Sequence, residues 1–197
     1  MHGGPRPSHV RRAVNENSGL TNGILPAWMQ MSVHPSCLTE EELLKECTLR
    51  SERRSGPGGQ HRNKVETAVI IVHQPTGTQA EANQRRSHAD NRREAIARLR
   101  LSLATRVRIP LTRPAPSELW QQRAHAGRLS VSSAHSDFAC LLAECLDRLH
   151  ADDYSLQKSA EFFSVTSSQL IKLLRQHPPA LIQVNAARAD RGMHKLS

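Results

Sequence analysis

The sequence predicts an α+β protein, with a short sheet and a covering helix followed by a small all-α domain. Three observations lead to this fold class. Residues 66–73, ETAVIIVH, form a β-branched apolar run that is typical of a strand. Residues 87–105 show a capped helical pattern. Residues 138–149 repeat apolar side chains at i, i+3, i+4, i+7, i+8 and i+11, which indicates an amphipathic helix.

The first half of the chain reads as a compact α+β unit. Thr39 to Glu42 resembles a capping box that opens a short helix or turn. Residues 47–52 are compatible with an extended strand, and a glycine-rich loop follows over 53–64. Gln74-Pro75-Thr76-Gly77 predicts a tight turn, so residues 78–83 are expected to return as the second strand of a hairpin.

The covering helix is expected to begin after Ser87, which is suited to cap it. Ile96, Leu99 and Leu103 fall on one face and would pack on the sheet. Four arginines lie mostly off this apolar stripe and stay available to solvent or phosphate: Arg92, Arg93, Arg98 and Arg100.

The second half is predicted to be helical. Residues 156–163, a break at 164–166, and residues 168–176 suggest two helices joined by a turn, and Pro178 and Pro179 would end the second. A last helix is expected over 181–190. This half can be a bundle that only packs, or its helix 168–176 can contact nucleic acid, although that helix carries only two bases.

We therefore divide the chain into four parts. Residues 1–36 are rich in Gly, Pro, Ser and Asn and are expected to be disordered. Residues 37–107 form the first domain, and residues 108–117, with three prolines, form a linker. Residues 118–197 form the helical domain, with a helix–turn–helix arrangement as one interpretation.

The charge of the chain points to a polyanionic partner. Its 197 residues include 27 Lys and Arg against 18 Asp and Glu, a formal net charge of +9. The segment 50–113 holds 14 of these bases and 5 of the acids, so it accounts for the whole excess. Such a basic concentration favours RNA or DNA as the partner.

Other classes of protein are disfavoured by what the sequence lacks. No apolar run approaches the length of a membrane span, so we expect a soluble protein. The four cysteines form no Cys-x-x-Cys pair and are expected to be reduced and structural. His34 and Cys37 have an H-x-x-C spacing but no second pair nearby, so we expect no metal site and no cofactor.

The stretch that carries chemistry is Gly58-Gly59-Gln60, within SGPGGQHRNK. Adjacent glycines reach backbone angles that other residues avoid, and they let a tip enter a narrow site. A glutamine amide donates and accepts hydrogen bonds but does not titrate near neutrality. It therefore suits the positioning of a water better than general-base catalysis.

The longer stretch RSGPGGQHRNKVETAVIIVHQPTG resembles the catalytic domain of bacterial-type class I peptide chain release factors and their ribosome-rescue relatives. The resemblance continues through Glu81 and Arg86-Ser87-His88 into a helix with Asn91, Ala95 and Leu99, and covers residues 46–105. It implies that the loop enters the peptidyl transferase centre, where Gln60 orients water onto the peptidyl-tRNA ester. Gly58 and Gly59 would permit the approach, and the Gln60 backbone N–H would stabilise developing charge.

The resemblance also implies partners and binding residues. The large ribosomal subunit, through its RNA, and peptidyl-tRNA would be bound, and a methyltransferase would modify the Gln60 amide. We expect a monomer that does not bind membranes. The residues expected to contact RNA are Arg53, Arg54, Arg62, Lys64, Arg85, Arg86, Arg92 and Arg93.

The resemblance alone does not decide between a codon-reading release factor and a ribosome-rescue protein. The sequence shows no recognisable stop-codon determinant, so codon-independent ribosome rescue by a peptidyl-tRNA hydrolase is the favoured function. The final residues are only mildly basic, unlike the strongly basic tail of the rescue hydrolases. A non-hydrolytic RNA-binding rescue factor is the alternative. Because residues 1–36 make a poor transit peptide, we expect the bacterial cytoplasm, with an organelle as the second option.

Overall fold

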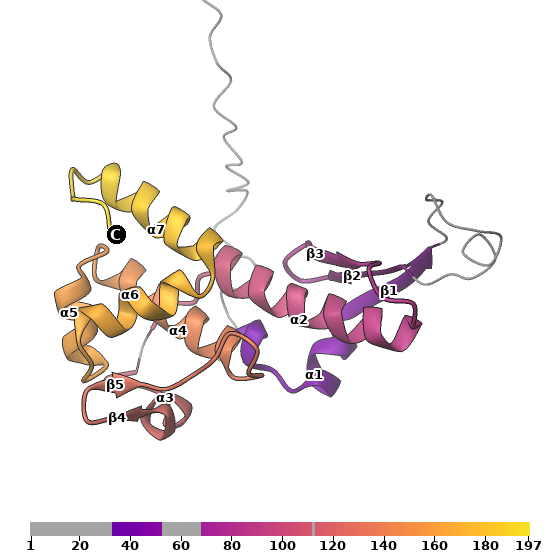
Figure 1. Ribbon diagram of the computed structural model, residues 1–197, viewed down its shortest axis with the longest axis horizontal. Helices are drawn as coiled ribbons and strands as arrows, with labels where there is room; N and C mark the ends of the chain where they lie inside the picture. The colour runs from indigo at the N-terminus through magenta and orange to yellow at the C-terminus, as the bar shows by residue number, and fades with distance from the viewer. Residues whose placement is uncertain (1–32, 53–67, 112) are drawn as a thin grey trace, which may run out of the picture.

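The computed structural model describes residues 33–52, 68–111 and 113–197 of the chain (Figure 1). It confirms the α+β class: a three-stranded sheet with a long helix across one face is followed by a group of shorter helices. In the described part of the chain, no helix is long and apolar enough to cross a membrane.

The first unit contains the sheet, with strand order β1-β2-β3 and antiparallel pairing throughout. A capping box formed by Thr39 and Glu42 starts its first α-helix, and the Ser87 hydroxyl caps the long helix, as the sequence predicted. Its elements are η2 (Pro35–Cys37), α1 (Glu40–Lys45), β1 (Cys47–Glu52), β2 (Ala68–His73), β3 (Thr78–Ala82) and α2 (His88–Arg106).

The core of this unit lies between the sheet and α2. Val69 and Ile71 alternate along β2 toward the helix, and both are buried. Leu99 and Leu103 of α2 belong to the same apolar cluster and are fully buried. The β-branched run of β2 therefore forms the central strand because one face of it is covered by α2.

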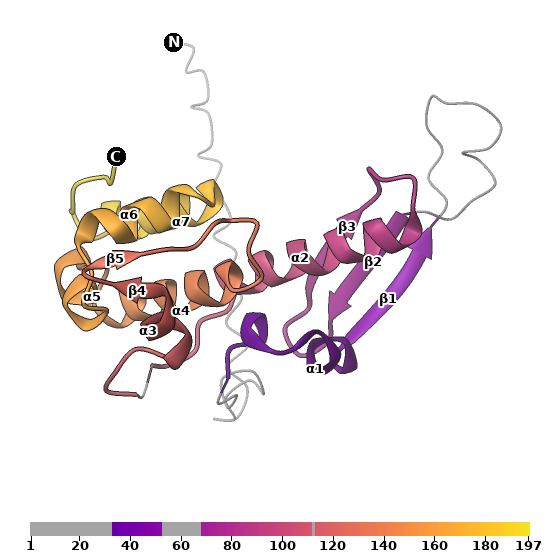
Figure 2. The same cartoon turned by 60° about the horizontal axis from the view of Figure 1, so that its bottom comes forward.

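The second unit is built mainly from helices (Figure 2). Trp120 and Phe163 stack in its core with ring centroids 3.8 Å apart. Pro178 and Pro179 end α6, as expected, but also occupy the first positions of the next helix, where a missing N–H costs nothing. The elements are α3 (Glu118–Arg123), β4 (Ala124–His125), β5 (Arg128–Leu129), α4 (Phe138–Ala151), α5 (Leu156–Phe162), α6 (Ser167–Arg175) and α7 (Pro178–Ala189).

Two small features of this unit were not predicted. The helix α3 and the hairpin formed by β4 and β5 lie in a stretch without apolar periodicity. Elements of two to six residues are too short to show such a period. The hairpin turns at Ala126 and Gly127, which both have positive φ angles, of 48° and 75°.

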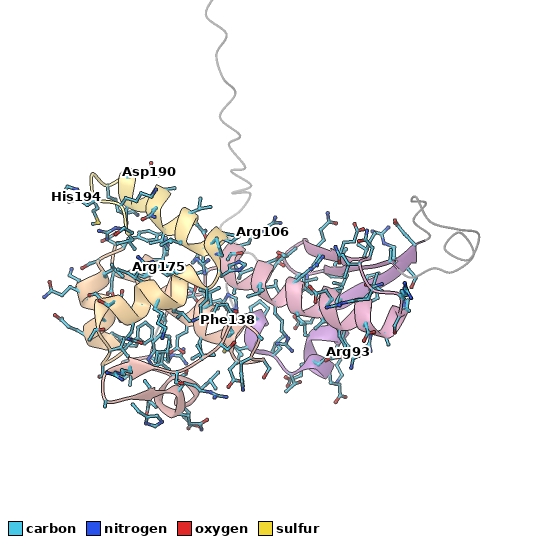
Figure 3. All side chains as sticks on the ribbon, in the orientation of Figure 1. Arg93, Arg106, Phe138, Arg175, Asp190 and His194 are labelled. Carbon is cyan, nitrogen blue, oxygen red and sulfur yellow. A yellow bond between two sulfur atoms is a disulfide. The ribbon has the colours of Figure 1, made fainter. Side chains whose placement is uncertain are left out.

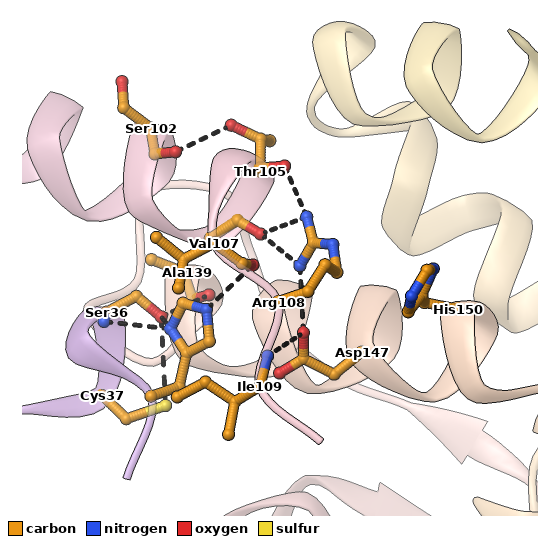
Figure 4. A network of polar contacts seen from close by, with 12 residues as sticks. Ser36, Cys37, Ser102, Thr105, Val107, Arg108, Ile109, Ala139, Asp147 and His150 are labelled. Carbon is orange, nitrogen blue, oxygen red and sulfur yellow. Dashed lines mark hydrogen bonds and ion pairs between the residues drawn. The ribbon is translucent and has the colours of Figure 1, made fainter. Parts of the chain in front are cut away.

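The two units meet where α2 packs against α4 (Figure 4). The carboxylate of Asp147 on α4 accepts hydrogen bonds from Arg108 at 3.1 Å and from the backbone N–H of Ile109 at 3.2 Å. Arg108 also donates to the Ala104 carbonyl at the end of α2. The residues that directly follow α2 are therefore hydrogen-bonded to α4.

The expected linker, residues 108–117, continues along α4. At its far end, the buried carboxylate of Glu144 accepts hydrogen bonds from the backbone N–H and the hydroxyl of Ser117, at 2.8 and 2.6 Å. Arg113 pairs with the same carboxylate at 2.8 Å. Proline content predicted that this segment would lack regular structure, but could not show that α4 holds both of its ends.

One prediction about the cysteines is wrong. Cys37 and Cys140 form a disulfide that joins η2 to α4, whereas Cys47 and Cys145 are free. The two bonded residues are 103 positions apart, so spacing in the sequence does not show that they are neighbours.

The expected boundary of the disordered N-terminal segment is also wrong. His34, Pro35 and Ser36 are buried, although we assigned them to that segment. Hydrogen bonds from Arg100 to the Ser36 and Leu38 carbonyls, at 2.8 and 2.6 Å, fix this stretch to α2. Residues 1–32 lie outside the described part of the chain.

His34 sits at the junction and gives it a testable pH dependence. Its Nδ1 accepts a hydrogen bond from the Ser36 N–H at 3.1 Å, and its Nε2 donates to the Val107 carbonyl at 3.3 Å. Burial lowers the pKa of His34 from 6.5 to about 4, although the bond to Val107 partly opposes this effect. Neutral His34 therefore stabilises the fold above about pH 6.5, and this contribution is lost as the pH falls toward 4.

We expect the stability difference between the chain and His34→Asn to shrink by roughly 2–3 kcal/mol between pH 7 and pH 4. The measurement is urea unfolding of both proteins over this range. Burial raises the pKa of Asp147 to about 6, but both proteins contain this group, so its effect cancels in the difference. A difference that does not change with pH would contradict a buried, neutral His34.

Candidate functional site

The candidate site lies at the end of the sheet where β1 finishes and β2 begins. Glu52 and Ala68 are register partners, so the connection over residues 53–67 leaves and re-enters the sheet at one point. Its predicted residues lie outside the described part of the chain: Gly58, Gly59, Gln60, Arg53, Arg54, Arg62 and Lys64. The structure describes the paired base from which this loop extends.

The connection from β3 to α2 reaches the same end of the sheet. Ala82, the last residue of β3, pairs with Val69 next to the start of β2. Arg85 and Arg86 follow in this connection, and both are exposed. The fold therefore brings two of the predicted RNA-contacting arginines to the base of the glycine-rich loop.

The other two predicted arginines extend this basic region onto α2. Arg92 is half-buried and Arg93 is exposed, and both lie in the first two turns of the helix (Figure 3 labels Arg93). Arg93 pairs with Asp90. Among the described residues, none forms an ion pair with the guanidinium group of Arg85, Arg86 or Arg92.

Asn91 holds this corner in place from inside. Its side chain is fully buried, and its Oδ1 accepts a hydrogen bond of 2.9 Å from the Arg85 backbone N–H. Its Nδ2 donates one of 2.9 Å to the Arg85 carbonyl. An amide is suited to this position because it offers a donor and an acceptor together. Asn91 thereby fixes the direction in which the chain carries Arg85 and Arg86.

A second polar contact joins α2 to the strand that leads into the loop. The Ser51 hydroxyl on β1 and Nε2 of His88 in the first turn of α2 are 2.9 Å apart. Further along α2, Arg98 donates to the Glu81 carbonyl of β3 at 2.8 Å. These contacts connect both edge strands to one helix. The sequence pattern marked Asn91 and His88 as part of the family resemblance but gave no sign of these roles.

Other reactive groups lie away from this site. His73 is buried at the opposite end of β2, where its nitrogens contact Glu46 and Thr76 at 2.8 Å. Burial, with Glu46 nearby, raises the pKa of the Cys47 thiol to about 11, so it is a poor nucleophile at neutral pH. In the described part of the chain, no group of three or more His, Cys, Asp or Glu side chains is placed to hold a metal ion.

Comparison with known proteins finds a family match that begins in the first unit and extends into the second. Residues 39–135 match the family model of the RF-1 domain. The chain is 35% identical over 99 residues to "Peptide chain release factor 1-like, mitochondrial" of Rattus norvegicus, which is 49% of this chain and 24% of the relative. It is 45% identical over 71 residues to "Peptide chain release factor 1" of Leptothrix cholodnii, or 35% and 20% of the two chains.

A third relative is named as a different release factor. "Peptide chain release factor 2" of Aromatoleum aromaticum is 31% identical over 99 residues, which is 50% of this chain and 24% of that protein. The chain thus spans about a quarter or less of the length of these relatives. The family match covers the candidate site and continues through the β4–β5 hairpin.

The Asn91 contacts lead to a direct test of how this corner is held. We expect Asn91→Ala to lower the free energy of unfolding by about 1–3 kcal/mol, because it removes both part-buried hydrogen bonds to the Arg85 backbone. Hydrogen exchange at the Arg85 amide should accelerate more than tenfold in native conditions. The matched control is Asn83→Ala, which removes a half-buried amide that contacts Glu81. Equal exchange at Arg85 in both variants would contradict the proposed role of Asn91.

Proposed function

Residues 39–135 belong to the RF-1 domain family of class I peptide chain release factors, and from this premise we propose that the protein releases nascent peptides on the ribosome. The proposed reaction is hydrolysis of the ester that joins the peptide to tRNA. Water adds to the ester carbonyl, and the bond between the carbonyl carbon and the tRNA ribose oxygen breaks. The peptide leaves as a carboxylic acid, and the tRNA regains its hydroxyl group.

The observation that carries this proposal is the position of Gly58-Gly59-Gln60 in the chain. The tripeptide lies within the matched residues and within the connection between the paired residues Glu52 and Ala68. The exposed Arg85 and Arg86 stand at the same end of the sheet. A loop meant for a narrow, RNA-lined centre requires a stable base and positive charge beside it, and this end of the sheet supplies both.

In the proposed mechanism, the Gln60 side chain orients the attacking water and excludes competing nucleophiles. Its amide does not titrate, so the contribution is one of position. The Gln60 backbone N–H stabilises the charge that develops on oxygen as the ester bond breaks. The arginines at the base of the loop hold the domain against ribosomal RNA phosphates.

We further propose that release does not depend on a stop codon. Residues 118–197 form a helical unit in which we recognise no tripeptide determinant for stop codons. The proposed partners are the RNA of the large ribosomal subunit and peptidyl-tRNA, with a methyltransferase that modifies the Gln60 amide. The proposed place of action is the cytoplasm or an organelle, since the similar release factors include bacterial and mitochondrial ones.

The test uses ribosomes that carry a labelled peptidyl-tRNA, with an empty decoding site, a stop codon, or a sense codon followed by further message. We expect release with the empty site, and Gln60→Ala should slow it on the order of 100-fold, because the side chain that positions the water is lost. His61→Ala is the matched control, because it changes the neighbouring residue but leaves the glutamine.

Three results would contradict parts of this account. Ribosome binding without release in any state would favour a non-hydrolytic rescue factor. Release only on a stop codon would overturn codon independence. Equal loss of activity in Gln60→Ala and His61→Ala would remove the special role of the glutamine.

A further inference from the structure

We propose that the second unit carries its own RNA-binding surface, formed by α6 and the β4–β5 hairpin, which contacts a double-helical segment of ribosomal RNA. We call it the hairpin–α6 face, and it consists of His125, Arg128, Ser168, Lys172 and Arg175, all of them exposed. The choice of RNA as the partner rests on the proposed function of the first unit.

The helices α5 and α6 form a helix–turn–helix. Residues 163–166 join them, and Ser164 has a φ angle of 52°, in the region that glycine occupies in many such turns. Phe163 and Val165 of the turn are buried in the core, so the turn is anchored on both sides of Ser164. In DNA-binding proteins that use this motif, the second helix meets the nucleic acid.

The hairpin is fastened beside the start of this second helix. The Gly127 carbonyl accepts a hydrogen bond from the Thr166 N–H at 3.4 Å. The Leu129 N–H donates to the Gln169 side chain of α6 at 3.3 Å. Arg128 immediately precedes Leu129 in β5 and is exposed, and the exposed His125 is its partner across the hairpin.

The outer side of α6 adds two further bases to this face. Ser168, Lys172 and Arg175 are spaced i, i+4 and i+7 and form one exposed line along the helix. The helix α6 contains no acidic residue. The neighbouring helix α5 carries one exposed acid, Glu161, whose carboxylate accepts a hydrogen bond from Gln157 of the same helix.

The acids of the second unit do not neutralise this face, because the fold uses several of them internally. Glu144 and Asp147 hold the ends of the segment 108–117, and both are buried. Asp152 is buried and accepts hydrogen bonds from Arg148 and Ser159. The nearly balanced charge of residues 118–197 therefore hides a surface that is more basic than the composition indicates.

The side chains of the face favour a duplex over a single strand. Single-stranded nucleic acids are usually held by exposed aromatic rings on which bases stack. Trp120 and Phe163 of this unit are buried in its core instead. Cations along a helix and a hairpin tip are suited to the phosphates and 2′-hydroxyls that an RNA duplex presents across its minor groove.

The face also keeps a fixed position relative to the first unit. Arg93 and Arg175 lie far apart on the molecule, in the first and second units (Figure 3). The helix α2 and the disulfide between Cys37 and Cys140 connect the two units. A ribosome that binds both basic surfaces would therefore hold the base of the loop at one distance from the second contact.

The experiment measures binding of the full chain to a fluorescein-labelled RNA duplex of about 16 base pairs, by anisotropy over a range of salt concentrations. The test variant is Lys172→Ala/Arg175→Ala, and the control is Lys45→Ala/Lys195→Ala, which removes the same charge from other exposed positions. Both are also made in an Arg85→Ala/Arg86→Ala background, so that the first unit does not mask the effect.

We expect the test variant to raise the Kd about tenfold. The slope of the logarithm of the association constant against the logarithm of the salt concentration should become less negative by about 1.8. The control should change the Kd less than twofold. Equal effects of the two variants, or no effect of either, would overturn the proposal. Equal affinity for a DNA duplex of the same sequence would overturn the choice of RNA.

The result can be separated from the catalytic proposal. Gln60→Ala should bind the duplex as well as the unchanged chain, since the loop is not part of the face. In the release assay, the test variant should need more protein for half-maximal release but reach the same maximal rate. A lower maximal rate with unchanged half-maximal concentration would contradict a binding role.

Discussion

The packing of α2 against α4 is the interaction on which the rest of the structure depends. Leu103 and Ala104 are consecutive residues of α2, yet one belongs to the core beneath the sheet and the other to the core of the helical unit. Because successive side chains of a helix point about 100° apart, one turn can serve two cores. Separating the units would expose the apolar surfaces of α2 and α4 that face one another, and would break the contacts of Asp147 with Arg108 and Ile109.

Because of this junction, the second unit is held in a fixed position against the first. A basic tail that binds RNA independently of the first unit would need a flexible connection to that unit. Here the connecting segment is fixed to α4 at both ends by Asp147 and Glu144, and the disulfide adds a covalent link. The acids that build this junction are withdrawn from the surface, and exposed bases remain on α6 and the hairpin. The same carboxylates thus set the position of the second unit and the charge of its surface.

The sequence predicted what local patterns encode. The strand β2 follows from its β-branched run, α2 from its Ser87 cap, and α4 from its apolar period. The disulfide and the clamp of Asn91 on Arg85 could not be predicted, because they depend on which segments meet in space. At the candidate site, sequence alone gave the tripeptide and the arginines by resemblance. The structure adds that Arg85, Arg86, Arg92 and Arg93 share one end of the sheet with the base of the loop.

The contacts between α2 and α4 imply that the two units move as one body. The most direct test measures the distance between two spin labels by pulsed electron spin resonance. Maleimide labels are attached at Gln79→Cys on β3 and Ile182→Cys on α7, two exposed positions in different units. A Cys47→Ser background removes the partly exposed free thiol. The account predicts one narrow distance distribution, unchanged when the chain binds ribosomes. A broad or divided distribution, or one that shifts on binding, would contradict it.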